Sequence, residues 1–268
     1  MHYFAGLFDA EGWVSLIQSG HFIIGLEVAH EQTVISLNDH FGGKIYKPTR
    51  KERKQVFSWR ISTNTDAARN FITQIEPYSI IKKQQLISLK SYLDHPRIER
   101  RDKRSDFVHT IAELKKPKVY TRNDLTVQQT IAPDSDFFEW FAGFMDGDGN
   151  FCIYEYEQAN KRRTFDSYIG IYNIFADPLI YVNERIQGSI SKLKGAKFPV
   201  WKWICSQANS ALVCDNLMPN LIIKKEQCRL VSQYLKIHDT KIRGIDHPDH
   251  VITEIRDIIK QIKHHNSL

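Results

Sequence analysis

Two acidic residues, Glu11 and Asp148, each precede the final glycine of the same nine-residue motif. The motif reads Phe-Ala-Gly-Leu-Phe-Asp-Ala-Glu-Gly at residues 4–12 and Phe-Ala-Gly-Phe-Met-Asp-Gly-Asp-Gly at residues 141–149. We predict that each copy forms a short right-handed helix. Its final glycine would adopt the left-handed backbone conformation and end the helix. Each acid would then lie at the negative end of the helix dipole, where a carboxylate costs a few tenths to ~1 kcal/mol. Because both copies share this unfavourable placement, we expect a compensating cation.

The two predicted helices carry small residues that would let them touch. These residues are Ala5, Gly6, Ala142 and Gly143. Such residues allow helix axes to approach more closely than the usual 8–10 Å. Contact between the helices would bring the two acids side by side. The earlier aspartate of each motif, Asp9 or Asp146, is expected to hydrogen-bond to the neighbouring helix rather than to bind metal.

Two adjacent carboxylates suit a divalent metal, and Mg²⁺ prefers such hard oxygen ligands. In two-metal phosphodiester chemistry the ions lie roughly 3.5–4 Å apart. The minor groove of B-DNA is only about 6 Å wide, so acids on touching helices could reach the scissile phosphates of both strands. A single Asp-x-Asp-Gly segment is more often a solvated loop or helix end. Its duplication favours the metal site.

The rest of the chain also repeats. The segment Pro-x-x-Ile-Ile-Lys-Lys at residues 77–83 returns at residues 219–225, and Asp94-His-Pro returns at Asp246. Co-linear matches predict a tandem duplication of an αββαββα unit. The predicted organisation is a first repeat at 1–114, a linker at 115–134 and a second repeat at 135–268.

Periodicity places two hairpins and several helices in each repeat. The expected strands are 13–17, 22–29, 44–49 and 56–62 in the first repeat and 151–156, 165–172, 190–194 and 200–206 in the second. The expected helices are 31–41, 64–75, 79–93 and 107–114, then 177–186, one from 209 and 251–262. Residues 97–104 are expected to form a solvated loop, and Asp136 with Glu139 a capping box.

These elements predict an α+β fold with two repeats related by a pseudo-twofold axis. The motif helices would lie at the interface between the repeats. The strands would form two four-stranded antiparallel sheets, each covered by helices on one face and open on the other.

The doubled motif resembles the LAGLIDADG homing endonuclease family in its single-chain, two-repeat form, and the likeness covers nearly the whole chain. The resemblance implies that the two sheets form a DNA-binding saddle. It also implies a site-specific enzyme that hydrolyses both strands of double-stranded DNA across the minor groove and leaves short 3′ overhangs. The implied cofactor is Mg²⁺, with Ca²⁺ or Mn²⁺ able to replace it for binding. By this match Glu11 and Asp148 bind the metals, with the backbone carbonyls of Ala10 and Gly147 nearby. Glu11 departs from the commoner aspartate.

The resemblance also implies a lysine beside each acid and a polar residue late in the second strand of each repeat. Lys82 and Lys224 match the lysines, and the lysine that follows each is the alternative. His30 and Asn173 match the polar, water-positioning residues less closely. Ser79 departs from the leucine that is usual in the lysine segment.

The second hairpin of each repeat is basic, which favours contact with DNA phosphates. The expected DNA-binding residues are Lys44, Lys47, Arg50, Lys51, Arg53, Lys54, Ser58 and Arg60 in the first repeat and Lys192, Lys194, Lys197 and Lys202 in the second. A charged run is usually a solvated face. Equivalent runs in equivalent hairpins favour DNA binding.

The formal charge of +6 also favours a polyanionic partner. No apolar run reaches the length of a membrane span, and the four cysteines form no CxxC pair. The motif starts at residue 4, so no targeting peptide is visible. We expect an intracellular monomer, encoded in an organelle or a prokaryote.

Two other functions fit the same basic surface. One is an RNA-binding maturase that assists splicing of a group I intron. The other is a DNA-binding regulator without catalysis. Acids and lysines present in both repeats favour the endonuclease.

Overall fold

The computed structural model describes residues 1–48, 55–121, 123–125, 130–157, 163–193, 195, 199–239 and 247–267. Its helices are α1 (His2–Glu11), α2 (Glu31–Phe41), α3 (Thr65–Ile75), α4 (Lys83–Asp94), α5 (Arg97–Glu113), α6 (Ser135–Asp148), α7 (Asp177–Asn183), α8 (Gln207–Leu217), α9 (Lys225–Asp239) and α10 (Asp249–Ser267). Its strands are β1 (Gly12–Leu16), β2 (Phe22–Val28), β3 (Lys44–Tyr46), β4 (Phe57–Ile61), β5 (Gly149–Glu157), β6 (Arg163–Asn173), β7 (Gly188–Lys192) and β8 (Trp201–Cys205).

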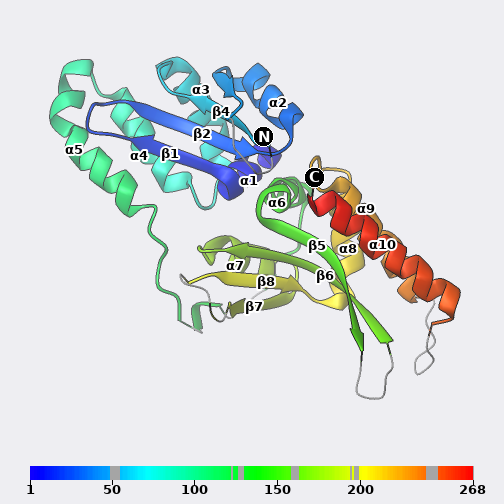
Figure 1. Cartoon of the computed structure of the whole chain (residues 1–268). Helices are drawn as coiled ribbons and strands as arrows, with labels where there is room; N and C mark the ends of the chain where they lie inside the picture. The colour runs from blue at the N-terminus through cyan, green and yellow to red at the C-terminus, as the bar shows by residue number, and fades with distance from the viewer. Residues whose placement is uncertain are drawn as a thin grey trace.

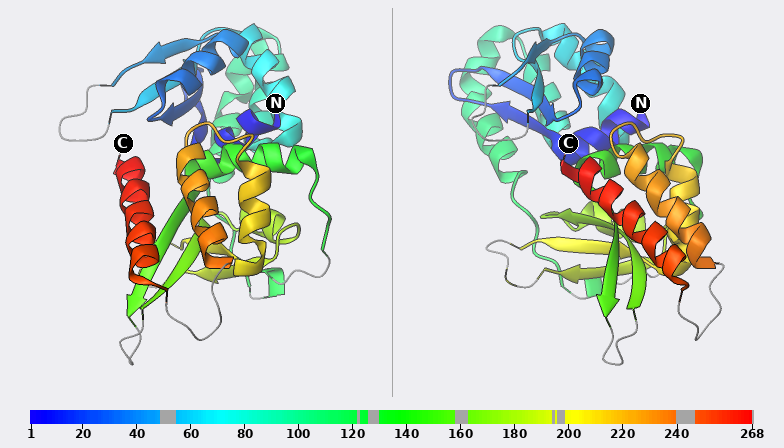
Figure 2. Two further views of the ribbon diagram at one scale, coloured as in Figure 1. Left: turned by 90° about the vertical axis from the view of Figure 1, so that its right-hand side faces the viewer. Right: turned by 45° about the vertical axis from the view of Figure 1, so that its right-hand side comes forward.

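The strands form two four-stranded antiparallel sheets with the same topology, as predicted. Their orders are β1-β2-β4-β3 and β5-β6-β8-β7. Figure 1 shows the two sheets on either side of the paired helices α1 and α6. The turned views in Figure 2 show α8, α9 and α10 packed together against the second sheet. The α+β fold with motif helices at the interface is therefore confirmed.

The contact between α1 and α6 is a backbone contact. A Cβ atom on Gly6 would lie 1.9 Å from the carbonyl oxygen of Trp140, and one on Gly143 would lie 1.9 Å from that of Tyr3. Ala5 and Ala142 are fully buried beside them. The predicted role of the small residues is confirmed, and it is symmetric.

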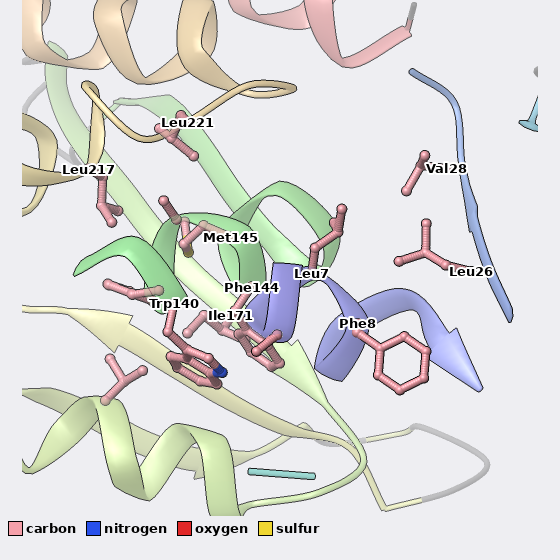
Figure 3. Close-up of a cluster of buried hydrophobic side chains, with 14 of the residues drawn as sticks. Leu7, Phe8, Leu26, Val28, Trp140, Phe144, Met145, Ile171, Leu217 and Leu221 are labelled. Atoms are coloured by element: carbon pink, nitrogen blue, oxygen red, sulfur yellow. The ribbon is translucent and has the colours of Figure 1, made fainter. Parts of the chain in front are cut away.

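Apolar side chains surround this contact. Figure 3 shows Leu7 and Phe8 of α1, Trp140, Phe144 and Met145 of α6, Ile171 of β6, and Leu26 and Val28 of β2 within the buried cluster. Alternation along the strands selects the buried face, as in β4, where Phe57, Trp59 and Ile61 are buried.

The two motif glycines end their helices in an unexpected conformation. Gly12 has φ −82° and Gly149 has φ −79°, so both are extended rather than left-handed. The prediction of a left-handed cap was wrong. Glycine is needed here because a Cβ would clash with the preceding turn, 2.5 Å from the carbonyl oxygen of Phe8 or of Met145.

Several predicted boundaries also differ. Residues 97–104 belong to helix α5 rather than a loop, because Pro96 starts the helix and Arg100 donates to the carbonyl oxygens of Leu93 and His95. Helix α6 is capped by Asp134, whose carboxylate accepts from the Phe137 amide, and not by Asp136. β3 ends at Tyr46.

No helix in the described parts of the chain is both long and apolar enough to cross a lipid bilayer.

Gly6→Ala or Gly143→Ala should lower the free energy of unfolding by at least about 3 kcal/mol, the upper end for overpacking. The added methyl group would force the backbones of α1 and α6 apart. Urea denaturation measures the loss. Ser36→Ala on exposed α2 is the control and should change stability by less than about 0.5 kcal/mol. A near-native stability for both glycine variants would contradict the backbone contact.

Candidate metal and nucleic-acid site

Glu11 and Asp148 are the last residues of α1 and α6, and the helix contact brings their carboxylates into one half-buried cluster. Burial, and after it the nearby Glu11 charge, raises the pKa of Asp148 to about 7, against the lowering effects of the Asn173 hydrogen bond and the charges of Lys82 and Lys224. Burial likewise raises the pKa of Glu11, while Lys224 and Lys82 lower it. The two acids therefore repel each other in a poorly solvated place.

The two predicted lysines lie at the same helix ends. Lys224 Nζ donates to three carbonyl oxygens at the end of α6, those of Met145 at 2.9 Å, Gly147 at 2.6 Å and Gly149 at 2.8 Å. Lys82 Nζ donates to the Asp9 carbonyl at 2.8 Å. Cations at the helix C-termini satisfy unpaired carbonyls and offset the dipole. The two lysines thus supply part of the positive charge that we expected to compensate the acids at the helix ends.

Asp9 is buried and places Lys82 by capping helix α4. Its carboxylate accepts hydrogen bonds from the backbone amides of Ile80 at 2.7 Å, Ile81 at 3.1 Å and Lys82 at 3.0 Å. Ser79 Oγ adds a fourth at 2.6 Å, which gives the departure from leucine a role. Since these amides bind Asp9, α4 starts at Lys83 rather than at the predicted residue 79.

Asp146 does the same for α9. It accepts from the amides of Ile222 at 2.8 Å, Ile223 at 3.0 Å and Lys224 at 2.7 Å. Each aspartate also accepts a bond from the other motif helix, Asp9 from Trp140 Nε1 at 3.1 Å and Asp146 from the Tyr3 hydroxyl at 2.7 Å. The expected structural role of these aspartates is therefore observed.

The two predicted polar residues, Asn173 and His30, differ in whether they contact an acid. Asn173, the last residue of β6, donates from Nδ2 to Asp148 Oδ2 at 2.6 Å. His30 lies beyond the end of β2, where its Nδ1 is 2.8 Å from Thr33 Oγ1. The structure therefore brings Asn173 to the acids and gives His30 a partner in α2.

A cavity of about 400 Å³ adjoins this cluster on the Asp148 side. Its lining residues are Ala10, Lys82, Asp148, Tyr172, Asn173, Ile174, Phe175 and Val200. The cavity thus combines an acid and an amide from the second repeat with a lysine from the first. It is a partly apolar space beside a carboxylate.

The unequal lengths of the two acids have a steric counterpart. A Cβ on Gly147 would lie 2.4 Å from Ala10 Cβ and 3.0 Å from Glu11 Cγ. The missing side chain of Gly147 therefore leaves room for the extra methylene of Glu11. In the first motif the residue equivalent to Gly147 is Ala10, so the shorter Asp148 faces the Ala10 methyl group.

The donor set fits a divalent ion such as Mg²⁺, since it offers two carboxylates that are costly to leave unneutralised. The predicted Gly147 carbonyl already accepts a bond from Lys224, although its second lone pair can still face an ion. No group of three or more His, Cys, Asp or Glu side chains with metal-binding geometry occurs among the described residues. Water and phosphate oxygens would have to complete the shell.

The open face of the first sheet presents Arg60. Its guanidinium lies over the rings of Trp13 and Tyr46, at 5.7 and 5.2 Å, and 3.5 Å from Glu27 Oε1. Lys44 pairs with Arg60 across β3 and β4 and shares this face. Ser58 does not meet its prediction as a DNA contact, because it is fully buried and its Oγ accepts from Arg60 Nε.

Two other predicted DNA contacts lie on the helix-covered side. Lys192 pairs with Trp201 and therefore lies on the same face of the sheet as the buried Trp203. Lys202 lies on the opposite, open face. Lys47 lies over the ring of Phe57, 5.0 Å from its centre. Strand alternation turns Lys192 away from the open face, whereas Lys47 follows the end of β3 and lies on the side of Phe57. The remaining predicted contacts, Arg50, Lys51, Arg53, Lys54, Lys194 and Lys197, lie outside the described residues.

The sequence interpretation missed a tyrosine cluster on the open face of the second sheet. It contains Tyr154, Tyr156, Tyr168 and Tyr172, and the last two hydroxyls are 2.7 Å apart. Their alternate spacing along the expected strands was the signal available. Tyrosines give this half a less charged surface than Arg60 and Lys44 give the first.

Comparison with known proteins identifies the fold. No protein-family model and no curated protein sequence matches the chain. Among solved structures it is similar to I-SmaMI bound to an uncleaved DNA target with calcium ions (17% identity, TM-score 0.67, 98% of each chain covered). It is also similar to the LAGLIDADG meganuclease I-AabMI bound to uncleaved DNA (13%, 0.68, 96% of this chain and 97% of that). A third is the homing endonuclease I-LtrWI bound to target DNA (16%, 0.69, 97% and 96%). The chain has the LAGLIDADG homing endonuclease fold.

Asp148→Asn should flatten the pH dependence of stability of the metal-free protein. Because the pKa of Asp148 is raised to about 7 from 3.8, the folded state binds more protons than the unfolded state within this window. The free energy of unfolding therefore falls as pH rises from 4 through 7. Asparagine removes this fall, so the variant should gain on the order of 1–3 kcal/mol over wild type at pH 8.

Urea denaturation across the pH range measures this difference, with Asp257→Asn on exposed α10 as the control. A variant less stable than wild type at pH 8 would contradict repulsion between the acids.

Lys224→Met should destabilise the protein by roughly 2 kcal/mol or more, because charged hydrogen bonds to three carbonyls are lost. Lys82→Met should cost less, since it loses one carbonyl bond. Lys225→Met, next in sequence and exposed, is the matched control. Thermal denaturation without metal ranks the three variants. Equal effects of Lys224→Met and Lys225→Met would disprove the helix-end role.

Proposed function

We propose that the protein is a site-specific, metal-dependent DNA endonuclease that acts as a single chain. It binds a long double-stranded target along the open faces of both sheets. It hydrolyses both strands across the minor groove and leaves short 3′ overhangs. The observation that supports this proposal most strongly is that two carboxylates from two repeats meet at the end of one helix pair, beside two half-buried lysines.

The solved proteins of the same fold support this proposal, since I-SmaMI, I-AabMI and I-LtrWI are each described bound to DNA. The calcium ions of the I-SmaMI complex support a divalent ion between the acids. In the present chain Glu11 and Asp148 would hold Mg²⁺, with the carbonyls of Ala10 and Gly147 near it. Bound Mg²⁺ supplies charge stabilisation at the phosphate and lowers the pKa of water.

The chain's own residues bind and orient the substrate. Arg60 and Lys44 on the first sheet and Lys202 and the tyrosines on the second would contact the duplex from the major groove side. The helix pair would face the minor groove between them. Lys82 and Lys224 fix the helix ends and place positive charge beside the acids, where negative charge develops on the phosphate during hydrolysis.

Asn173 would orient one oxygen of Asp148 through its hydrogen bond at 2.6 Å. It leaves the second carboxylate oxygen for the ion. Its amide also borders the cavity, where a water molecule could be held against the phosphate.

Glu11→Gln or Asp148→Asn should reduce cleavage of a selected target by at least about 100-fold, the scale of losing a main electrostatic group. A randomised duplex library is first cut in Mg²⁺ and sequenced to obtain the target. Binding is then measured in Ca²⁺ and should stay within about threefold of wild type, because phosphate contacts dominate affinity.

Asp257→Asn is the control and should cut normally. Wild type that binds a duplex but cuts none in Mg²⁺ or Mn²⁺ would contradict the proposal and favour a regulator without catalysis.

A further inference from the structure

The strand register shows which residues of the two repeats are equivalent. Gly12 pairs with Leu26 and Gly149 with Ile171. Farther along, Leu26 pairs with Trp59 as Ile171 pairs with Trp203. Leu26 is therefore the counterpart of Ile171. Counting two residues on, Val28 is the counterpart of Asn173, and not His30 as the sequence predicted.

The two equivalent positions have opposite chemistry. Asn173 is held at both ends, since its Oδ1 accepts from the Phe175 amide at 2.8 Å while its Nδ2 donates to Asp148. This pairing fixes which end of the amide faces the acid. Val28 is 6% exposed and belongs to the apolar cluster, where Figure 3 shows it beside Leu26. It can give Glu11 no hydrogen bond.

Other surroundings add to this difference. Glu27, next to Val28, adds a like charge near Glu11, whereas the equivalent residue beside Asn173 is Tyr172. The cavity beside the helix ends is lined by Asp148 and Lys82 but not by Glu11. Within the described part of the chain Glu11 makes no side-chain hydrogen bond. Its longer side chain also has one more bond to order.

From these contacts we propose that the two acidic centres are unequal and that DNA is cut in order. The Asn173–Asp148 centre, already oriented and open to a cavity, cuts its strand first. The Glu11–Val28 centre cuts the second strand more slowly, so nicked DNA accumulates. This inference rests on the proposed endonuclease function. Asn173 is a positioning residue that acts through Asp148.

Supercoiled plasmid carrying the selected target separates the two steps, because nicked and linear products migrate differently. Wild type should nick at least about tenfold faster than it linearises, and end-labelled duplexes should show one strand cut first. Asn173→Val should slow nicking by about 10- to 100-fold, the usual effect of losing a residue that orients a ligand. Asn173→Gln should restore most of the rate and the strand preference.

Val28→Asn is the reciprocal variant and should speed the second cut, so that less nicked plasmid accumulates. Val28→Ala is the matched control, because it shortens the same side chain without adding an amide. It should leave the second cut no faster than wild type. Melting temperatures show that each variant is folded. If Val28→Asn is unfolded, Val28→Gln replaces it.

A metal-free readout tests the contact itself. In ¹⁵N-labelled protein, the Asn173 side-chain amide resonance should move in Asp148→Asn and stay in place in Glu11→Gln. Wild type that cuts both strands together, or Asn173→Val that slows both cuts equally, would overturn the inference but leave the endonuclease proposal intact. Failure to cut either strand would instead refute the endonuclease proposal.

Discussion

The structure depends on the backbone contact between α1 and α6. Because Gly6 and Gly143 lack side chains, each motif helix packs directly on a carbonyl of the other. The C-termini of both helices therefore lie side by side, which brings Glu11 and Asp148 together. A fold that placed ordinary side chains in this contact would separate the acids by the width of those side chains.

This contact brings like charges together, and residues of the same two helices partly offset the repulsion. Two acids and two sets of unpaired carbonyls meet where water is scarce. Asp9 and Asp146 hold the segments that deliver Lys82 and Lys224, so each motif positions the lysine that offsets its own dipole. The remaining negative charge belongs to Glu11 and Asp148 themselves. A divalent ion and DNA phosphate are the partners that would use it.

Much of this arrangement follows from the sequence because the motif and its duplication are local patterns. The sheets, the helix contact and the meeting of both acids could be predicted from residue type and spacing, whereas the lysines beside them were predicted from the family resemblance. The left-handed caps could not, because the glycines respond to a clash within the preceding turn rather than to backbone handedness. The start of α4 depended on Asp9, which is distant in sequence.

The surface residues that differ from the prediction do so for separate reasons. Lys192 was assigned by charge, whereas strand register puts it on the side of Trp203. Ser58 lies on the expected face but is buried, and its Oγ accepts a hydrogen bond from Arg60. Val28 was overlooked because the strands of the two first hairpins differ in length, five residues in β1 against nine in β5, and only strand pairing reveals which residues are equivalent. Sequence patterns thus predicted the local motifs but not the residue equivalences that depend on strand pairing.

The central claim is that Glu11 and Asp148 together hold a divalent ion at the DNA. Anomalous diffraction from a Mn²⁺-soaked complex with the selected duplex tests it most directly. We expect a manganese peak within about 2.0–2.6 Å of a carboxylate oxygen of each acid and near a phosphate. Peaks found only elsewhere, with both acids bonded to Lys82 and Lys224, would contradict it.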